Sequence, residues 1–253
     1  MYTIDLNCDM GESYGAYTLG CDAEAMPHVT SINVACGFHA SDPTTMLNTV
    51  RLAKQHGVAV GAHPSFPDLV GFGRRVVAAS MEEIYADVVY QIGALWAICQ
   101  SEDVKMQHVK VHGALYNAAE KDMATAKAIA KAIKAVDPNL YMVCLGNSTM
   151  VEAAKEVGVK FVEEAFADRA YTAQGTLVSR KQAGAVLHDL DIIADRVLTM
   201  VKEKTVTSID GIVVPISSQT ICVHGDTPGA VDMIKTIKEK LQQNGIELQS
   251  FAR

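Results

Sequence analysis

One stretch of the sequence, residues 61–75, combines residue types that can do chemistry with a constrained backbone. It places His63, Ser65 and Asp68 among two prolines and three glycines and ends in two arginines. Proline fixes φ and removes a backbone donor, whereas glycine reaches conformations that are closed to other residues. Because the stretch follows an apolar run at residues 57–60, we predict a shaped loop that leaves a buried strand, where functional residues concentrate. An ordinary strand-to-helix connection is the alternative.

Polar side chains also follow the other apolar runs of the chain. Asn7, Asp9 and Glu12 follow the first run. Later runs are followed by His39, His63, Lys110, His112, Asn147, Glu164, Asp168, Arg169, His224 and Asp226. The carboxyl ends of parallel strands converge on one face of a barrel, where such enzymes place their active sites. We therefore predict that these groups share one functional pocket.

Two kinds of chemistry suit this set of side chains. Histidine and carboxylate groups titrate near neutral pH when their surroundings tune them, which allows general acid and base catalysis. The candidates for these roles are Asp9, His39, His63, His112 and Asp168. The same atoms can bind a divalent metal, and a metal would then be held among Asp9, His39, His63 and His112. The sequence has no H-E-x-x-H motif, so spacing leaves the metal open.

Basic and amide side chains near these positions are candidates for holding a substrate. Arginine and lysine bind carboxylate or phosphate groups. We assign substrate binding to Asn7, Glu12, Arg74, Lys110, Arg169 and His224, whereas Arg75 is equally well explained as a solvated surface charge. There is no G-x-x-x-x-G-K-[ST] motif, so any ATP would be bound without the standard phosphate loop. Ser65 lacks a Gly-x-Ser-x-Gly elbow, which argues against a serine hydrolase.

The elements that must position these residues alternate along the chain. Seven apolar runs predict strands at residues 3–7, 31–37, 58–62, 107–112, 140–145, 160–164 and 220–224. Capping residues and periodicity predict helices at 43–56, 81–99, 123–136, 149–156, 180–204 and from Thr227-Pro228 to Asn244, and Trp96 is expected in the core. Strands that alternate with helices imply a parallel sheet. Nothing marks a domain boundary, so we predict one TIM-like (β/α) barrel domain spanning residues 1–253. An open doubly wound sheet is the alternative, but no G-x-G-x-x-G follows the first strand.

Composition limits the function classes. The chain has 253 residues, 49% of them hydrophobic, and a net charge of −7, so a nucleic-acid partner is not expected. Its amino terminus lacks a secretion signal and no apolar run is long enough to span a bilayer. Six cysteines without a Cys-x-x-Cys pair indicate reduced, buried thiols, and we expect a cytoplasmic protein without membrane contact.

Six motifs of the chain resemble those of the LamB/YcsF family. They lie at residues 5–12, 33–43, 61–75, 110–117, 164–171 and 222–226, and they span nearly the whole sequence in the family's order. The resemblance implies a seven-stranded (β/α) barrel of the glycoside hydrolase/deacetylase kind. It also implies one component of a bacterial 5-oxoprolinase, which works with two further subunits, B and C. That enzyme opens the lactam of 5-oxo-L-proline to L-glutamate while it hydrolyses ATP, taken up with Mg²⁺.

The resemblance leaves the individual catalytic roles open. A base among Asp9, His39 and His63 would activate water, His112 or Asp168 would return a proton to nitrogen, and Arg74 or Lys110 would hold an anionic group. Two other readings belong to different classes. One is a stand-alone metal-dependent deacetylase or amidohydrolase, which would need no ATP. The other is a non-catalytic scaffold subunit, which would tolerate substitution of every pocket residue.

Overall fold

Seven parallel strands close into a barrel in the computed structural model, which describes residues 2–225 and 229–252. In barrel order the strands are β1 (Tyr2–Met10), β2 (Ser31–Ala35), β3 (Ala59–His63), β4 (Met106–Val109), β5 (Tyr141–Leu145), β6 (Lys160–Phe166) and β9 (Thr220–Val223). Closure comes from β9, which pairs with β6 on one side and β1 on the other. The TIM-like barrel predicted from the sequence is confirmed, and the open sheet is excluded.

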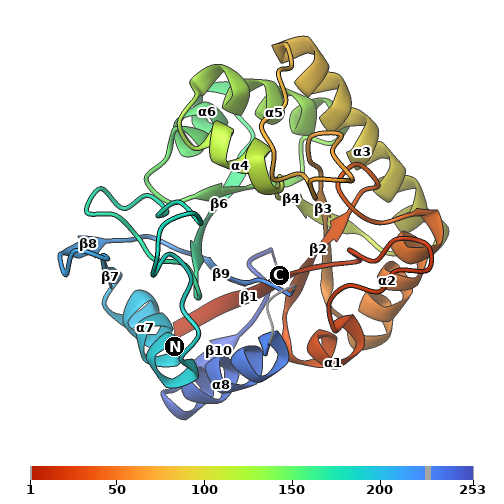
Figure 1. Cartoon of the computed structure of the whole chain (residues 1–253). Coiled ribbons are helices and arrows are strands. Elements are labelled where there is room, and N and C mark those ends of the chain that lie inside the picture. The colour runs from red at the N-terminus through yellow and green to blue at the C-terminus, as the bar shows by residue number, and fades with distance from the viewer. Residues whose placement is uncertain (1, 226–228, 253) are drawn as a thin grey trace.

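Helices surround the ring of strands (Figure 1). They are α1 (Asp22–Ala25), followed by the 3₁₀ turn η1 (Met26–His28), α2 (Pro43–His56), α3 (Met81–Ser101), α4 (Gly113–Ala119), α5 (Met123–Val136), α6 (Thr149–Val157), α7 (Leu190–Lys202) and α8 (Ala230–Gln243). Local sequence explains their ends. The Asp42 side chain accepts the amides of Thr44 and Thr45 at the start of α2, and Ser80 forms a capping box with Glu83 at the start of α3.

Two predicted features of the helices are wrong. The helix expected at 180–204 begins only at Leu190, where the Asp189 side chain accepts the Ile192 amide. Residues before it form a loop that includes Gly184 at φ +79°, a conformation that breaks a helix. Trp96, expected in the core, is 45% exposed, because the buried face of α3 is filled by Ile92 and Leu95. The predicted cap at Thr227-Pro228 lies outside the described residues.

Three short strands lie outside the barrel prediction. A hairpin joins β7 (Thr205–Thr207) to β8 (Val213–Pro215), and β10 (Ile246–Leu248) pairs in parallel with the first residues of β1. The chain after β10 turns across the barrel end at which the strands begin, and Figure 1 shows the carboxyl terminus within the ring. There the ring of Phe251 makes edge contacts with His108 and Tyr141. This segment covers the barrel end opposite the site described below.

Each of the six cysteines is a free thiol and only Cys21 is exposed, as the sequence predicted for reduced cysteines. Among the described residues no helix is long and apolar enough to cross a membrane.

Candidate active site

The interior of the barrel is polar along one side of β1. Side chains two residues apart face the same side of a strand, so Asp5, Asn7 and Asp9 form a column directed into the barrel. Asp5, fully buried, accepts hydrogen bonds from the hydroxyls of Thr30 and Thr220, among others. Burial outweighs these bonds and raises the pKa of Asp5 to about 6. The column leads from the barrel floor to the carboxyl end of the strand.

A buried ammonium group organises the middle of this interior. Lys110 Nζ lies 2.8 Å from Glu164 Oε1, 3.2 Å from Asp9 Oδ1 and 2.9 Å from Cys222 Sγ. Burial by itself would lower the pKa of Lys110, but the carboxylates of Asp9 and Glu164 hold it well above its usual range. The Asn7 amide donates to Glu164 at 3.1 Å, which satisfies the same carboxylate from a second side. The site therefore contains a fixed positive charge.

Asp9 is the carboxylate of this group that reaches the cavity. Burial would raise the pKa of Asp9, but His63 and Lys110 beside it hold that pKa well below its usual range. The Asn33 amide donates to Asp9 Oδ1 at 2.8 Å, and His63 Nε2 lies 3.4 Å from Oδ2. Asp9 is thus ionised and oriented, as a general base must be.

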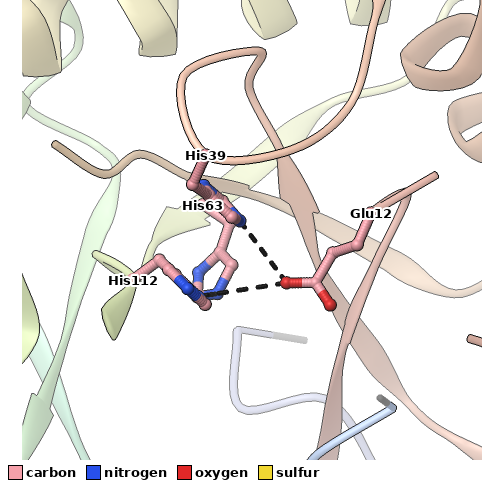
Figure 2. Close-up of side chains that lie close together, drawn as sticks. All are labelled: Glu12, His39, His63 and His112. Atoms are coloured by element: carbon pink, nitrogen blue, oxygen red, sulfur yellow. Dashed lines mark hydrogen bonds and ion pairs between the residues drawn. The ribbon is translucent and has the colours of Figure 1, made fainter. Parts of the chain in front are cut away.

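Three histidines and a glutamate converge beside Asp9. Figure 2 shows Glu12, His39, His63 and His112 directed toward one another from separate segments of the chain. One ligand-type atom from each lies within 4.8 Å of the others, and all four residues are buried. The rings of His39 and His112 stack at 3.9 Å, whereas His63 meets both edge-on. Burial lowers the pKa of His39 and of His112 well below the usual value, so both rings are neutral.

The loop at residues 64–75 holds this histidine cluster in place. Its Phe72 carbonyl lies 2.9 Å from His112 Nε2, and the ring of Phe72 packs edge-on against His39 and His112. Phe72 has φ +55°, a conformation that costs a non-glycine residue about 1 kcal/mol or more. Gly73 follows at φ +61°, and a Cβ there would lie 2.2 Å from Ser65 Oγ. The glycine is therefore required for the loop to approach the barrel this closely.

A cavity of about 410 Å³ opens at the carboxyl ends of the strands. Its walls include the acidic and histidine side chains of Asp9, His63, His112 and His224, the basic side chains of Arg74, Lys110, Arg169 and Arg180, and the rings of Tyr116 and Phe166. This volume lies in the range of small-molecule sites. One wall is charged and another is aromatic, so the cavity suits a small anion with an apolar portion.

The far wall of the cavity pairs a histidine with a buried carboxylate. Asp168 accepts from His224 Nδ1 at 2.9 and 3.0 Å. Burial would raise the pKa of Asp168, but His224 beside it holds that pKa below its usual value. Arg169 on the same loop donates to the carbonyls of Val178 and Ala185, while burial and Arg180 lower its pKa to about 10. The pair resembles a carboxylate that holds a histidine in one tautomer.

All eleven residues proposed from the sequence for catalysis or substrate binding gather here. Seven of them line the cavity: Asp9, His63, Arg74, Lys110, His112, Arg169 and His224. The other four stand directly behind: Asn7 bonds to Lys110, Asp168 to His224, His39 stacks on His112, and Glu12 is near both histidines. Asn147, also expected at the pocket, is instead exposed and donates to the Pro215 carbonyl. Asp226 lies outside the described residues.

Several residues of the site were not singled out from the sequence. Asn33 and His108 hold the network below Asp9, Tyr116 donates to Glu164 at 3.0 Å, and Arg180 lines the cavity. The first two were within reach, because His108, Lys110 and His112 alternate along one strand and must share its inner face. Arg180 was assigned to a helix, so its place in the cavity wall was hidden.

Fold and site together define a parallel (β/α) barrel with a charged small-molecule pocket at its carboxyl-terminal face. Residues 4–253 match the family model described as the LamB/YcsF family. The chain belongs to this family. It is similar to the 5-oxoprolinase A subunit of Clostridium beijerinckii, with 52% identity over 248 residues that cover 98% of this chain and 97% of that protein.

A second relative and a solved structure agree with this placement. The 5-oxoprolinase A subunit of Acinetobacter baumannii is 52% identical over 248 residues and 98% of both chains. The crystal structure of a lactam utilization protein from Thermus thermophilus superimposes with a TM-score of 0.95 at 49% identity and covers 98% of this chain and 100% of that chain. Barrel architecture and family are therefore established together.

Proposed function

We propose that this chain is the A subunit of an ATP-dependent 5-oxoprolinase, which opens 5-oxo-L-proline to L-glutamate while ATP is hydrolysed to ADP and phosphate. The observation that carries the proposal is the cavity in which an ionised Asp9, a fixed Lys110 cation and the His224–Asp168 pair face the same space. The names of the relatives supply the substrate, because every relative described above acts, by name, on 5-oxoproline or lactams.

The cavity offers a separate contact for each part of such a substrate. The carboxylate of 5-oxoproline would face the guanidinium groups of Arg74 or Arg180, which bind carboxylates well. Its small apolar ring would lie against Phe166 and Tyr116. Lys110 has acceptors on several sides, so we assign it to the orientation of Asp9 and to the field of the site, more than to direct contact with substrate.

Lactam opening needs an activated oxygen and a positioned water. In our scheme the lactam oxygen attacks the γ-phosphorus of ATP and ADP leaves. Water then gives a proton to Asp9 and adds to the ring carbon, His224 delivers a proton to nitrogen, and the C–N bond breaks. The resulting γ-glutamyl phosphate is hydrolysed by a second water to glutamate and phosphate. Asp168 keeps His224 oriented for this transfer.

ATP, its Mg²⁺ and the partners B and C belong to the same proposal. The relatives are named as one subunit of an oxoprolinase, which favours a reaction completed by other chains. A phosphate donor bound by a partner would need only the open mouth of the cavity here.

The test is production of glutamate and ADP from 5-oxoproline and ATP, by this chain alone and with the two partner subunits. We expect activity only in the full mixture, with at least about 100-fold lower turnover for Asp9→Asn or His224→Gln. Asp191→Asn, an exposed carboxylate on α7, is the matched control and should keep full activity. Full turnover by folded Asp9→Asn and His224→Gln would refute the assigned roles and favour a scaffold. Amide hydrolysis by the chain alone without ATP would favour a stand-alone hydrolase.

A further inference from the structure

Two imidazole nitrogens of the histidine cluster face each other with no hydrogen available between neutral rings. His63 Nδ1 lies 2.6 Å from the Lys110 carbonyl, and His112 Nε2 lies 2.9 Å from the Phe72 carbonyl. A carbonyl oxygen can only accept, so each of these nitrogens carries the hydrogen of its ring. The remaining nitrogens, His63 Nε2 and His112 Nδ1, are 3.0 Å apart and both present lone pairs. Such a contact is repulsive unless a positive charge lies between or beside them.

A metal cation satisfies this geometry better than a shared proton. A proton would serve only the two nitrogens, but two carboxylates converge there as well. Glu12 Oε1 lies 3.9 Å from His112 Nδ1, and Asp9 Oδ2 lies 3.4 Å from His63 Nε2. Ligand atoms at about 2.0–2.1 Å from a tetrahedral zinc are separated by about 3.3–3.4 Å, close to the 3.0–3.9 Å seen here. The ligands thus need only small shifts to close on one ion.

The surroundings of the two rings are also those of metal ligands. Histidines that bind a metal usually donate their second nitrogen to a carbonyl or carboxylate, which fixes the tautomer and the ring orientation. His63 and His112 both do so. Both also line the cavity, so an ion between them would keep a position open to water or substrate. An open fourth position is typical of catalytic rather than structural zinc.

We propose that His63 Nε2, His112 Nδ1 and the Glu12 carboxylate bind one divalent transition-metal ion, zinc first, at the wall of the cavity. His39 stands outside this set, because its ring is parallel to that of His112 and cannot direct a lone pair to the same point. Its Nε2 lies 3.4 Å from Glu12 Oε1, where it orients the carboxylate. Asp9 remains beside the ion as a fourth oxygen donor or as a base toward bound water.

The experiment measures metal on the purified chain, without partners, ATP or lactam. The chain is stripped with EDTA, re-equilibrated with zinc or manganese, and analysed for bound metal by mass spectrometry and for its melting temperature. We expect one zinc per chain, a melting temperature that rises with zinc, and binding at least about 100-fold weaker in His63→Gln or His112→Gln, more than loss of an outer partner costs. His108→Gln is the matched control, since His108 is equally buried in the barrel but lies outside the cluster.

Two results would overturn the proposal: a folded wild-type chain that takes up no zinc or manganese, or variants that bind zinc as tightly as the wild type. If the histidine variants do not fold, Glu12→Gln preserves the side-chain shape and must weaken zinc binding by at least about 10-fold. The outcome is independent of the proposed function. A metal-free chain that supports 5-oxoproline turnover would refute this site alone, and a zinc-binding chain without such turnover would refute the function alone.

Discussion

Replacement of Lys110 by methionine tests whether the buried cation stabilises the barrel interior. The Lys110 side chain is 3% exposed and that of Glu164 is fully buried, with 2.8 Å between their charged atoms. Methionine keeps most of the apolar stem but leaves Glu164 and Asp9 without their shared cation. Removal of one partner of a buried ion pair costs about 3–5 kcal/mol, because the other charge remains desolvated. That cost is a large part of a total stability of about 5–15 kcal/mol.

A double-mutant cycle isolates the interaction from the packing change. Glu164→Gln alone leaves Lys110 paired with Asp9, and the double variant removes both members of the closer pair. We expect Lys110→Met and Glu164→Gln to be less destabilising together than the sum of the single changes, with a coupling of at least about 2 kcal/mol. The measurement is urea unfolding of all four proteins, followed by far-UV circular dichroism.

An exposed pair elsewhere in the chain provides the control. Lys127 and Glu156 also form an ion pair, but their side chains are 35% and 55% exposed. Solvent screening should limit the coupling of this pair to below about 1 kcal/mol. If Lys110→Met loses less than about 1 kcal/mol, or if the two cycles give equal couplings, the buried cation does not stabilise the interior and our reasoning about it is refuted.

Three further predictions address the floor, the loop and the closed end of the barrel. Asp5 has a pKa of about 6 in the folded protein against an ordinary value of 3.8, so it favours folding when protonated and this contribution is lost as pH rises from about 4 to 6. Urea unfolding between pH 4 and 7 should therefore show the stability of Asp5→Asn improving relative to wild type by up to about 3 kcal/mol, and a pH-independent difference would contradict this. Gly73→Ala should lose about 2–3 kcal/mol in the same assay, because its Cβ would meet Ser65 Oγ at 2.2 Å, whereas Gly15→Ala, at similar φ in open space, should lose about 1 kcal/mol. Equal losses would show that the loop can move away. Phe251→Ala should lower thermal stability by about 1–2 kcal/mol through its lost ring contacts, and an unchanged melting temperature would mean that the terminal segment does not hold the barrel end closed.

The barrel could be predicted because its signals are local. Each of the seven strands was placed within three residues at either end, and five helices were recognised from caps such as Ser80 or Asp42 that act within one turn. Where the local signal was weak, the prediction failed. The apolar periodicity after Leu190 was extended back over residues 180–189, although the chain there follows contacts with Arg169 rather than helical spacing. β10 has only three residues and is specified by its pairing with β1, which is remote in sequence.

The candidate site could be predicted as a gathering of residues but not as an arrangement. Strand ends identified His63, His112 and Asp9, since topology alone brings them to one face. The tautomers of the histidines depend on carbonyls of Lys110 and Phe72, which side-chain identities do not reveal. Trp96 fails for a similar reason, because an aromatic residue at helical spacing does not indicate how wide the buried stripe of α3 is.

The strand register explains why the chemistry of the cavity and the stability of the barrel depend on the same bonds. Asp9 pairs in register with Asn33, Asn33 with Gly61, and Gly61 with His108, so these four residues form one layer across three strand pairs. A Cβ on Gly61 would lie 2.1 Å from His108 Nε2, so the glycine makes the room in which His108 bonds to Asn33 at 2.8 Å. Asn33 then has only its amide hydrogens to offer above, and they orient Asp9 Oδ1 and Asn7 Oδ1. Any substitution that disturbs this layer must change the orientation of the base together with the register of β2 and β3, because no apolar layer separates the site from the core beneath it.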